Sequence, residues 1–268
     1  MNRLIGLLSC AVVTSASAAS AQVLQPWSEP AIKGISLDAL RPAFEGGGTS
    51  ALTTVDQLSF RWPVGAMVLT AELPFVNAKA DGASSGALLI GNPFLGAATA
   101  PTSSFIGDFG VRIPVVSVST FERGFAQLVG VLADFMDFEA YGEDLLSIRA
   151  TAGYRYHAPS HLGMRVALRP TFVKPVGSSS GADPELFLDY GVQGGYETDR
   201  ASFGVAFTGR AILTESGSIG ERTVHDLALG GSATFGQFRP GLSVRVPLDK
   251  DLGDVLKYSV GLKLEVAF

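Results

Sequence analysis

The sequence contains one cysteine, Cys10, among 268 residues. A single thiol excludes an internal disulfide framework and a metal site built from several cysteines. Charged residues are scarce as well, at 17%, and the formal net charge is -5. Nucleic-acid binding requires a basic surface, so this balance argues against a nucleic-acid partner.

Long apolar runs are also missing after the N-terminal region. The longest, residues 125–136, is interrupted by Gln127 and Asp134 and is shorter than the ~20 residues that a membrane-spanning helix needs. The chain is nonetheless 47% hydrophobic, holds 32 glycines and has a mean hydropathy of +0.30. High hydropathy without a spanning helix is typical of a membrane β-barrel, in which alternation disperses the apolar residues.

The N-terminus has the parts of a secretory signal: a basic Arg3, an apolar run, and small residues that end in Ala19-Ser20-Ala21. The small-x-small pattern predicts cleavage after Ala21, so we expect residues 1–21 to be a signal peptide and residues 22–268 to be the exported chain. Lipid attachment at Cys10 is the alternative. It would leave a very short apolar core and would give the small-residue tract no role.

The C-terminal segment alternates between large apolar side chains and small or polar ones. The apolar positions are Tyr258, Val260, Leu262, Leu264, Val266 and Phe268. A period of two indicates a β-strand with one apolar face. Phe268 is the last residue, and here the chain resembles outer-membrane proteins in general, whose terminal phenylalanine is recognised by the barrel-assembly machinery. The resemblance implies that machinery and the outer-membrane bilayer as partners; a soluble β-sandwich is the alternative.

Similar segments recur along the chain, and together they predict about twelve strands. One is placed within residues 35–44; the others are expected at 58–64, 67–75, around Phe94, 105–115, 146–156, 164–172, 186–196, 203–213, 224–235, 238–246 and 258–268. Short and long connections alternate along the chain, as in barrels with short periplasmic turns and longer external loops. The predicted fold class is all-β: a transmembrane antiparallel up-and-down β-barrel with one short helix in an external loop.

Aromatic residues collect at the strand ends next to the short turns. They are Trp62, Phe105, Tyr156, Tyr196, Phe203, Phe235, Phe238 and Phe268. Aromatic girdles mark the membrane interfaces of such barrels, so we expect these side chains at the periplasmic interface.

The long connection from Ser117 to Leu145 departs from the strand pattern. Its apolar residues recur every three or four positions, at Phe121, Phe125, Leu128, Leu132, Phe135 and Met136. This spacing favours an amphipathic helix, which could cover the external mouth or fold into the lumen. A strand hairpin broken at Gly130 is the alternative.

Charged residues on the strands have the parity opposite to the apolar faces, so we expect them to line the barrel interior. They are Arg61, Glu72, Asp108, Arg112, Arg149, Arg155, Arg165, Arg169, Asp189, Arg210, Asp226, Arg239, Arg245, Lys263 and Glu265. Arginine outnumbers the strand carboxylates, and a short turn sets Arg155 opposite Arg165. The wall formed by Arg149, Arg155, Arg165 and Arg169 would attract anions in a water-filled pore. Alternatively, the arginines pair with carboxylates and fill a narrow lumen.

Catalytic and metal-binding patterns are weak. Ser160 lies between His157 and His161, but in a predicted periplasmic turn, and His225 has no obvious serine or acid partner in the sequence. No histidine pair has metal-ligand spacing beside a carboxylate. The glycines lie outside the strand-to-helix context of a phosphate-binding loop, so no cofactor is expected.

A family resemblance enters at residues 60–75. This segment is similar to the opening hairpin of the outer-membrane transporters associated with the meta pathway of phenol degradation, which end the strand in a motif like Leu73-Pro74-Phe75. The family resumes after a loop with Gly-Asp, where this chain has Gly91-Asn92. The resemblance implies a transporter for small, aromatic or hydrophobic compounds, and the arginines favour solutes with a negative group.

The sequence thus predicts an outer-membrane channel or transporter that lets small molecules diffuse, and no enzyme. Two alternatives stay open. One is a closed structural or adhesive barrel that acts through its external loops, and the other is an outer-membrane lipid hydrolase.

Overall fold

The computed structural model describes residues 31–46, 49–50, 52–100, 103–177 and 181–268. The expected signal peptide and its cleavage site lie outside these residues. The strands are β1 Gly34–Phe44, β2 Thr54–Val64, β3 Met67–Ala78, β4 Ala87–Ile90, β5 Phe94–Thr99, β6 Phe105–Arg112, β7 Leu145–His157, β8 Leu162–Pro175, β9 Glu185–Glu197, β10 Ala201–Ile212, β11 Thr223–Ala233, β12 Phe238–Pro247 and β13 Leu256–Ala267.

Each strand separates polar from apolar side chains, and β8 shows this most clearly. Arg165, Arg169 and Thr171 are buried, whereas the alternate residues, including Leu168 and Phe172, are exposed. Alternation therefore turns polar groups inward and apolar groups outward, the reverse of a water-soluble domain. The exposed apolar side chains surround the barrel as a lipid-compatible belt.

The sheet closes on itself. β1 pairs with β13 on one side and with β2 on the other, and every neighbouring pair is antiparallel. β4 and β5 lie end to end along β3, which pairs with β4 at residues 75–78 and with β5 at residues 67–72. The thirteen labelled strands therefore form a closed barrel of twelve, and this confirms the predicted fold class.

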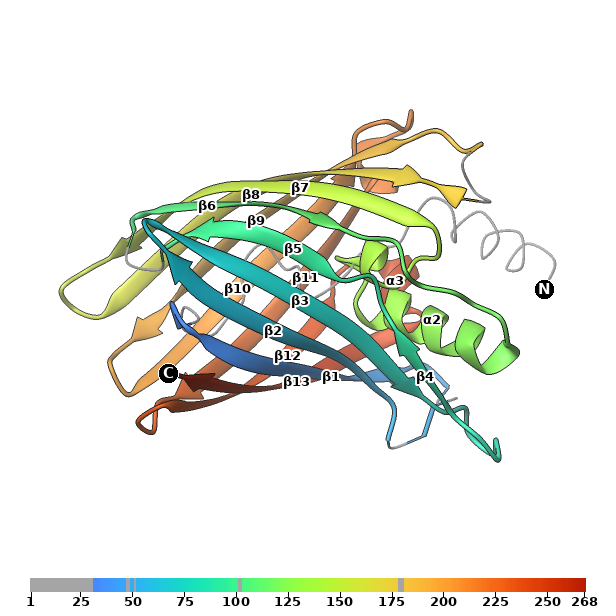
Figure 1. Ribbon diagram of the computed structural model, residues 1–268, viewed down its shortest axis with the longest axis horizontal. Coiled ribbons are helices and arrows are strands. Elements are labelled where there is room, and N and C mark those ends of the chain that lie inside the picture. Colours follow the sequence, from blue (N-terminus) through green and yellow to red (C-terminus); the bar gives the residue numbers. More distant parts are fainter. Residues whose placement is uncertain (1–30, 47–48, 51, 101–102, 178–180) are drawn as a thin grey trace.

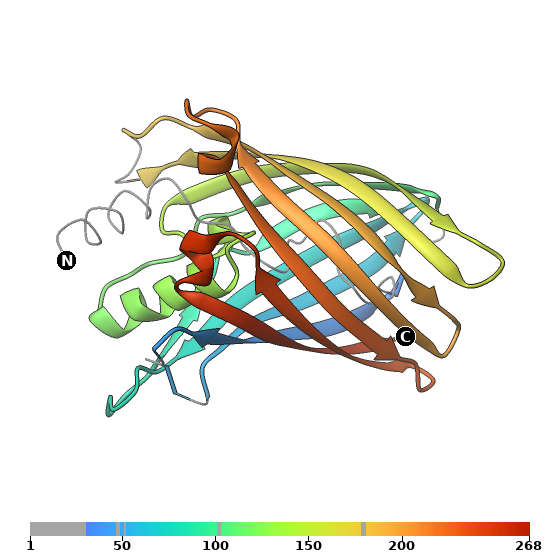
Figure 2. The same cartoon turned by 180° about the vertical axis from the view of Figure 1, so that it is seen from behind.

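The two ends of the barrel differ (Figures 1 and 2). The turns near the C-terminus are short, whereas the longer connections and the helices gather at the opposite end. Besides α2 Phe121–Ala133 there are a one-turn helix, α3 Lys250–Gly253, and the short 3-10 turns η1 Phe138–Ala140 and η3 Ile219–Glu221. No helix in the described part of the chain is long and apolar enough to cross a membrane.

The helix expected between Ser117 and Leu145 is α2, Phe121–Ala133, so the alternative of a strand hairpin is wrong. The Thr120 side chain caps its N-terminus by accepting a hydrogen bond from the Arg123 amide, at 3.3 Å. Its buried face packs against β3 and β4 in one apolar cluster that includes Val76, Leu89 and Val129.

Gly130, the expected break point of that alternative hairpin, instead allows close packing. A Cβ at this position would lie 2.8 Å from both the Tyr141 ring and the Val76 side chain.

Candidate functional site

We call residues 113–144 the plug. α2 lies across the mouth of the barrel that is remote from the C-terminus (Figure 1), and the residues from Ala133, its last, to Gly142 are all buried. The plug carries three acidic residues in this buried part, Asp134, Asp137 and Glu139, and each contacts an arginine of the barrel wall.

The charged strand residues expected in the lumen lie on the inner side of the wall, buried or half-buried. Those of the middle and outer parts of the barrel are Glu72, Asp108, Arg112, Arg149, Arg169, Asp189, Arg210, Asp226 and Arg245. Those nearer the short turns are Arg61, Arg155, Arg165, Arg239, Lys263 and Glu265. The plug forms ion pairs with four arginines of the first group: Arg112, Arg149, Arg210 and Arg245.

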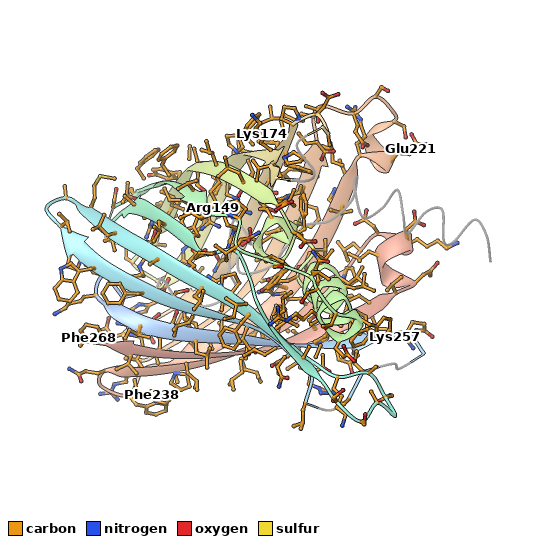
Figure 3. The ribbon with its side chains drawn as sticks, turned by 45° about the vertical axis from the view of Figure 1, so that its right-hand side comes forward. Arg149, Lys174, Glu221, Phe238, Lys257 and Phe268 are labelled. Carbon is orange, nitrogen blue, oxygen red and sulfur yellow. The ribbon has the colours of Figure 1, made fainter. Side chains whose placement is uncertain are left out.

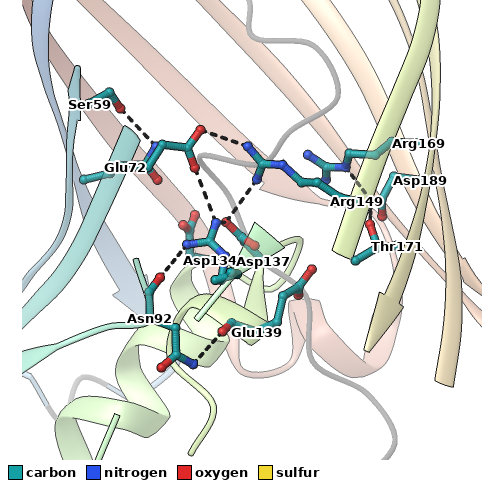
Figure 4. Close-up of polar contacts among 12 residues, drawn as sticks. Ser59, Glu72, Asn92, Asp134, Asp137, Glu139, Arg149, Arg169, Thr171 and Asp189 are labelled. Carbon is teal, nitrogen blue, oxygen red and sulfur yellow. Dashed lines mark hydrogen bonds and ion pairs between the residues drawn. The ribbon is translucent and has the colours of Figure 1, made fainter. Parts of the chain in front are cut away.

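The first contact joins the plug to β6, β3 and β7 (Figure 4). Asp137 forms an ion pair with Arg112 and lies 3.9 Å from Arg149. Both arginines also contact Glu72, at 3.5 and 2.8 Å, and the Arg149 guanidinium lies 3.7 Å from the Phe94 ring centroid. Burial raises the pKa of Asp137 to about 7, although the two arginines act in the opposite direction.

The second contact joins the plug to β9 and β10. Arg210 donates two hydrogen bonds to Glu139, both 3.2 Å long, and is also paired with Asp189. Asp189 accepts a further bond of 2.8 Å from Arg169. All four side chains are almost completely buried. Two arginines and one carboxylate of the wall thus meet one carboxylate of the plug.

The third contact is the ion pair between Asp134 and Arg245 of β12, 3.3 Å long. Beside it, Phe135 and Met136 pack against Leu256 of β13. The cavity left between the plug and β11 to β13 measures about 10 Å³, which is room for about one water molecule. The plug therefore fills this side of the lumen closely.

The sequence left open whether the strand arginines pair with carboxylates, and Glu197 was not among the acidic residues expected in the wall. Arg149 and Arg169 pair with carboxylates, and Arg165 lies 2.7 Å from Glu197. Arg155 faces Arg165 across β7 and β8, as the short turn predicted. Glu72, Asp189 and Glu197 belong to the wall itself, so this side of the lumen is a paired network rather than a positive wall. Nothing in the local pattern of Asp134, Asp137 and Glu139 singled them out, because their partners lie on remote strands.

Asn92 connects the plug to the interruption between β4 and β5. Its side-chain amide donates to the carbonyls of Glu139 and Gly142, at 2.8 and 2.7 Å, and its side-chain oxygen accepts from the amides of Val115 and Val116. A carboxylate could not donate the first two bonds. The amide that replaces the acidic residue of the resembling family therefore has a defined structural role here.

The aromatic residues expected at one membrane interface are all exposed, and they lie on or beside strand ends next to the short turns. Phe238 and Phe268 lie together at one end of the barrel, opposite Glu221 and Lys257 (Figure 3). The Lys33 ammonium group lies 4.2 Å from the Trp62 ring centroid and 5.1 Å from that of Phe268. Their role as an interface girdle stays a prediction.

The histidines differ from their sequence interpretation in one respect. His225 has an acid partner after all, Asp249 at 3.1 Å, and its other ring nitrogen lies 2.8 Å from the Tyr190 hydroxyl. His157 instead pairs with Glu197, at 3.1 Å. Within the described residues, no group of three or more potential metal ligands occurs.

No family model matches the sequence, and no curated protein matches it. Solved structures match the fold. The COG4313 outer membrane channel from Pseudomonas putida F1 is 13% identical, with a TM-score of 0.58 over 90% of this chain and 97% of the other. LpxR from Salmonella typhimurium is 9% identical, with a TM-score of 0.52 over 88% and 100%. The NanC porin is 8% identical, with a TM-score of 0.51 over 87% and 100%.

Proposed function

We propose that this protein is an outer-membrane channel for small anionic solutes and that the plug closes it in the state described. The observation that carries the proposal is the plug itself, because its buried carboxylates pair with lumen arginines on three different strands. Removal of the plug would expose a lumen lined by arginine, which favours anions. The fold shared with a channel and a porin supports this function.

The nature of the plug contacts distinguishes a channel from a permanently closed barrel. Buried ion pairs stabilise a structure less efficiently than apolar packing of similar volume, whereas they give specificity and can exchange partners. A purely structural filling would gain more from apolar residues at Asp134, Asp137 and Glu139. Charged contacts at all three positions therefore favour a plug that can leave its site.

Export and insertion belong to the same proposal. We infer that residues 1–21 are a cleaved signal peptide and that the barrel-assembly machinery recognises the last strand through Phe268. The resemblance of residues 60–75 to transporters of the meta pathway of phenol degradation supports a small aromatic solute. The wall arginines that pair with the carboxylates of the plug support a negative group on that solute.

Planar-bilayer recordings across a salt gradient test the channel. The variant Asp134→Asn/Glu139→Gln removes two charges of the plug, and Asp81→Asn/Glu122→Gln makes the same charge change at exposed positions. We expect small or rare current steps for the wild type and the control, and larger anion-selective steps for the plug variant. Absence of current from every folded barrel would reject the channel and favour action through the external loops.

A further inference from the structure

The plug places an aromatic ring beside a carboxylate in the barrel wall. Phe138 and Glu139 are consecutive residues of η1, and both are buried. The Phe138 ring meets the Phe187 ring edge to face, with 5.5 Å between the centroids. The Glu139 carboxylate receives the fork of two hydrogen bonds from Arg210. Phe187 and Arg210 lie on the paired strands β9 and β10.

The wall side of this contact combines an apolar part and a cationic part. Val173 and Ile212 belong to the same buried cluster as Phe187 and Phe138. The Arg210 guanidinium lies 4.9 Å from the Phe187 ring centroid, so the two parts adjoin. A phenylalanine ring binds another aromatic ring well in the edge-to-face arrangement, and an arginine binds a carboxylate well through two parallel hydrogen bonds.

The charges at this place favour an anion whenever the plug is absent. Arg169 and Arg210 share the single wall carboxylate of Asp189, and Glu139 supplies the second negative charge. In addition, the buried Arg169 Nη2 has no hydrogen-bond partner in the described part of the chain. A buried arginine that loses its partner is strongly unfavourable. Departure of Glu139 leaves Arg169 and Arg210 with the single carboxylate of Asp189, which favours another anion in its place.

We propose that Phe187, Arg210, Val173 and Ile212 form a binding site for an aromatic carboxylate, which Phe138-Glu139 occupies as an internal mimic of that ligand. An incoming aromatic acid replaces both halves of the mimic at once. A neutral aromatic compound lacks the charge for Arg210, and a short aliphatic acid lacks the ring for Phe187. The inference rests on the proposed channel for the route of the solute, but binding can be measured without transport.

Calorimetric titration of the purified full-length barrel with benzoate, benzamide and acetate tests the site. Phe138→Ala/Glu139→Ala removes both halves of the mimic. Phe121→Ala/Glu122→Ala is the matched control, because it removes the same two residue types from the exposed start of α2, where Phe121 is 83% exposed. We expect Phe138→Ala/Glu139→Ala to bind benzoate at least ~10-fold more tightly than the wild type and the control do. The same variant should also bind benzoate at least ~10-fold more tightly than it binds benzamide or acetate.

A single substitution checks the charge rule separately. Phe138→Ala leaves Glu139 on Arg210 and opens only the ring half, so this variant should favour benzamide over benzoate. It also keeps the proposal testable if the double variant does not fold.

Two outcomes would overturn the site: equal affinity of the double variant for benzoate and benzamide, or equal benzoate affinity in the double variant and the control. Selective benzoate binding supports the site even if bilayers show no current, in which case only the channel proposal fails.

Discussion

Replacing Asn92 by aspartate should loosen the plug with almost no change in side-chain shape. The substitution keeps the two bonds that the side-chain oxygen accepts from Val115 and Val116. It removes the two donated bonds and sets a carboxylate oxygen against the carbonyls of Glu139 and Gly142, at positions now 2.8 and 2.7 Å from the amide nitrogen. Both carbonyls belong to the plug, so the defect falls on its contact with the wall.

The size of the effect follows from the two lost bonds. A buried polar group without its partner costs about 1–3 kcal/mol, so two carbonyls correspond to about 2–6 kcal/mol. Since 1.4 kcal/mol is a factor of ten, even the lower limit raises the open fraction of the plug by about 30-fold. Protonation of the new carboxyl at low pH restores one donor, and the effect should then shrink.

Hydrogen exchange of the plug amides measures this opening directly. We expect amides within residues 113–144 to exchange faster in Asn92→Asp by about 30-fold or more, while those of β7 to β10 stay unchanged. Asn77→Asp is the control, because it makes the same chemical change at an exposed position of β3. Unchanged exchange of the plug in Asn92→Asp would refute the reasoning that Asn92 fastens it.

Three further predictions concern the helix, the pH response and assembly. Gly130→Ala should impair docking of α2 by about 1–3 kcal/mol through overpacking, and this should lower the Tm. Gly124→Ala is the control: a Cβ there makes one ordinary contact, with Val118, so this variant should be neutral or slightly stabilising. Equal effects of the two substitutions would contradict the close approach at Gly130. Burial raises the pKa of Asp137 from 3.8 to about 7 in the plugged state, so the closed state becomes more stable relative to the open state as the pH falls through that range. The current through the wild type should therefore rise with pH between about 4 and 7. The current through Asp137→Asn should not change with pH in this range. Removal of Phe268 should lower the yield of inserted barrel in cells far more than Phe235→Ala, and similar yields on heat-modifiability gels would count against a terminal assembly signal.

The local sequence pattern predicted the helix of the plug, but only the tertiary structure shows where that helix lies. The three- and four-residue spacing of apolar side chains predicted α2, because helix periodicity is written into a short segment. The same pattern could not decide whether the helix covers the mouth or enters the lumen. That choice depends on contacts with β3 and β4 and on ion pairs with β6, β10 and β12.

The role of Asn92, a residue of the barrel wall, could not be predicted from the sequence either. Its replacement of an acidic residue was visible in the sequence as a departure from a family pattern, without a reason. The reason lies in two carbonyls of the plug, 47 and 50 residues further along the chain. The interruption between β4 and β5 was visible only as a weak strand around Phe94.

The sequence by itself determined the barrel, its twelve strands, the ends that carry short and long connections, and the side of the wall on which each charged residue lies. These properties follow from a period of two and from turn lengths, which involve only neighbouring residues. The tertiary structure alone decided the partners of the arginines, because Arg245 and Asp134 are 111 residues apart and Arg210 and Glu139 are 71 apart. Closure of the barrel brings such residues together, and closure is a property of the whole chain.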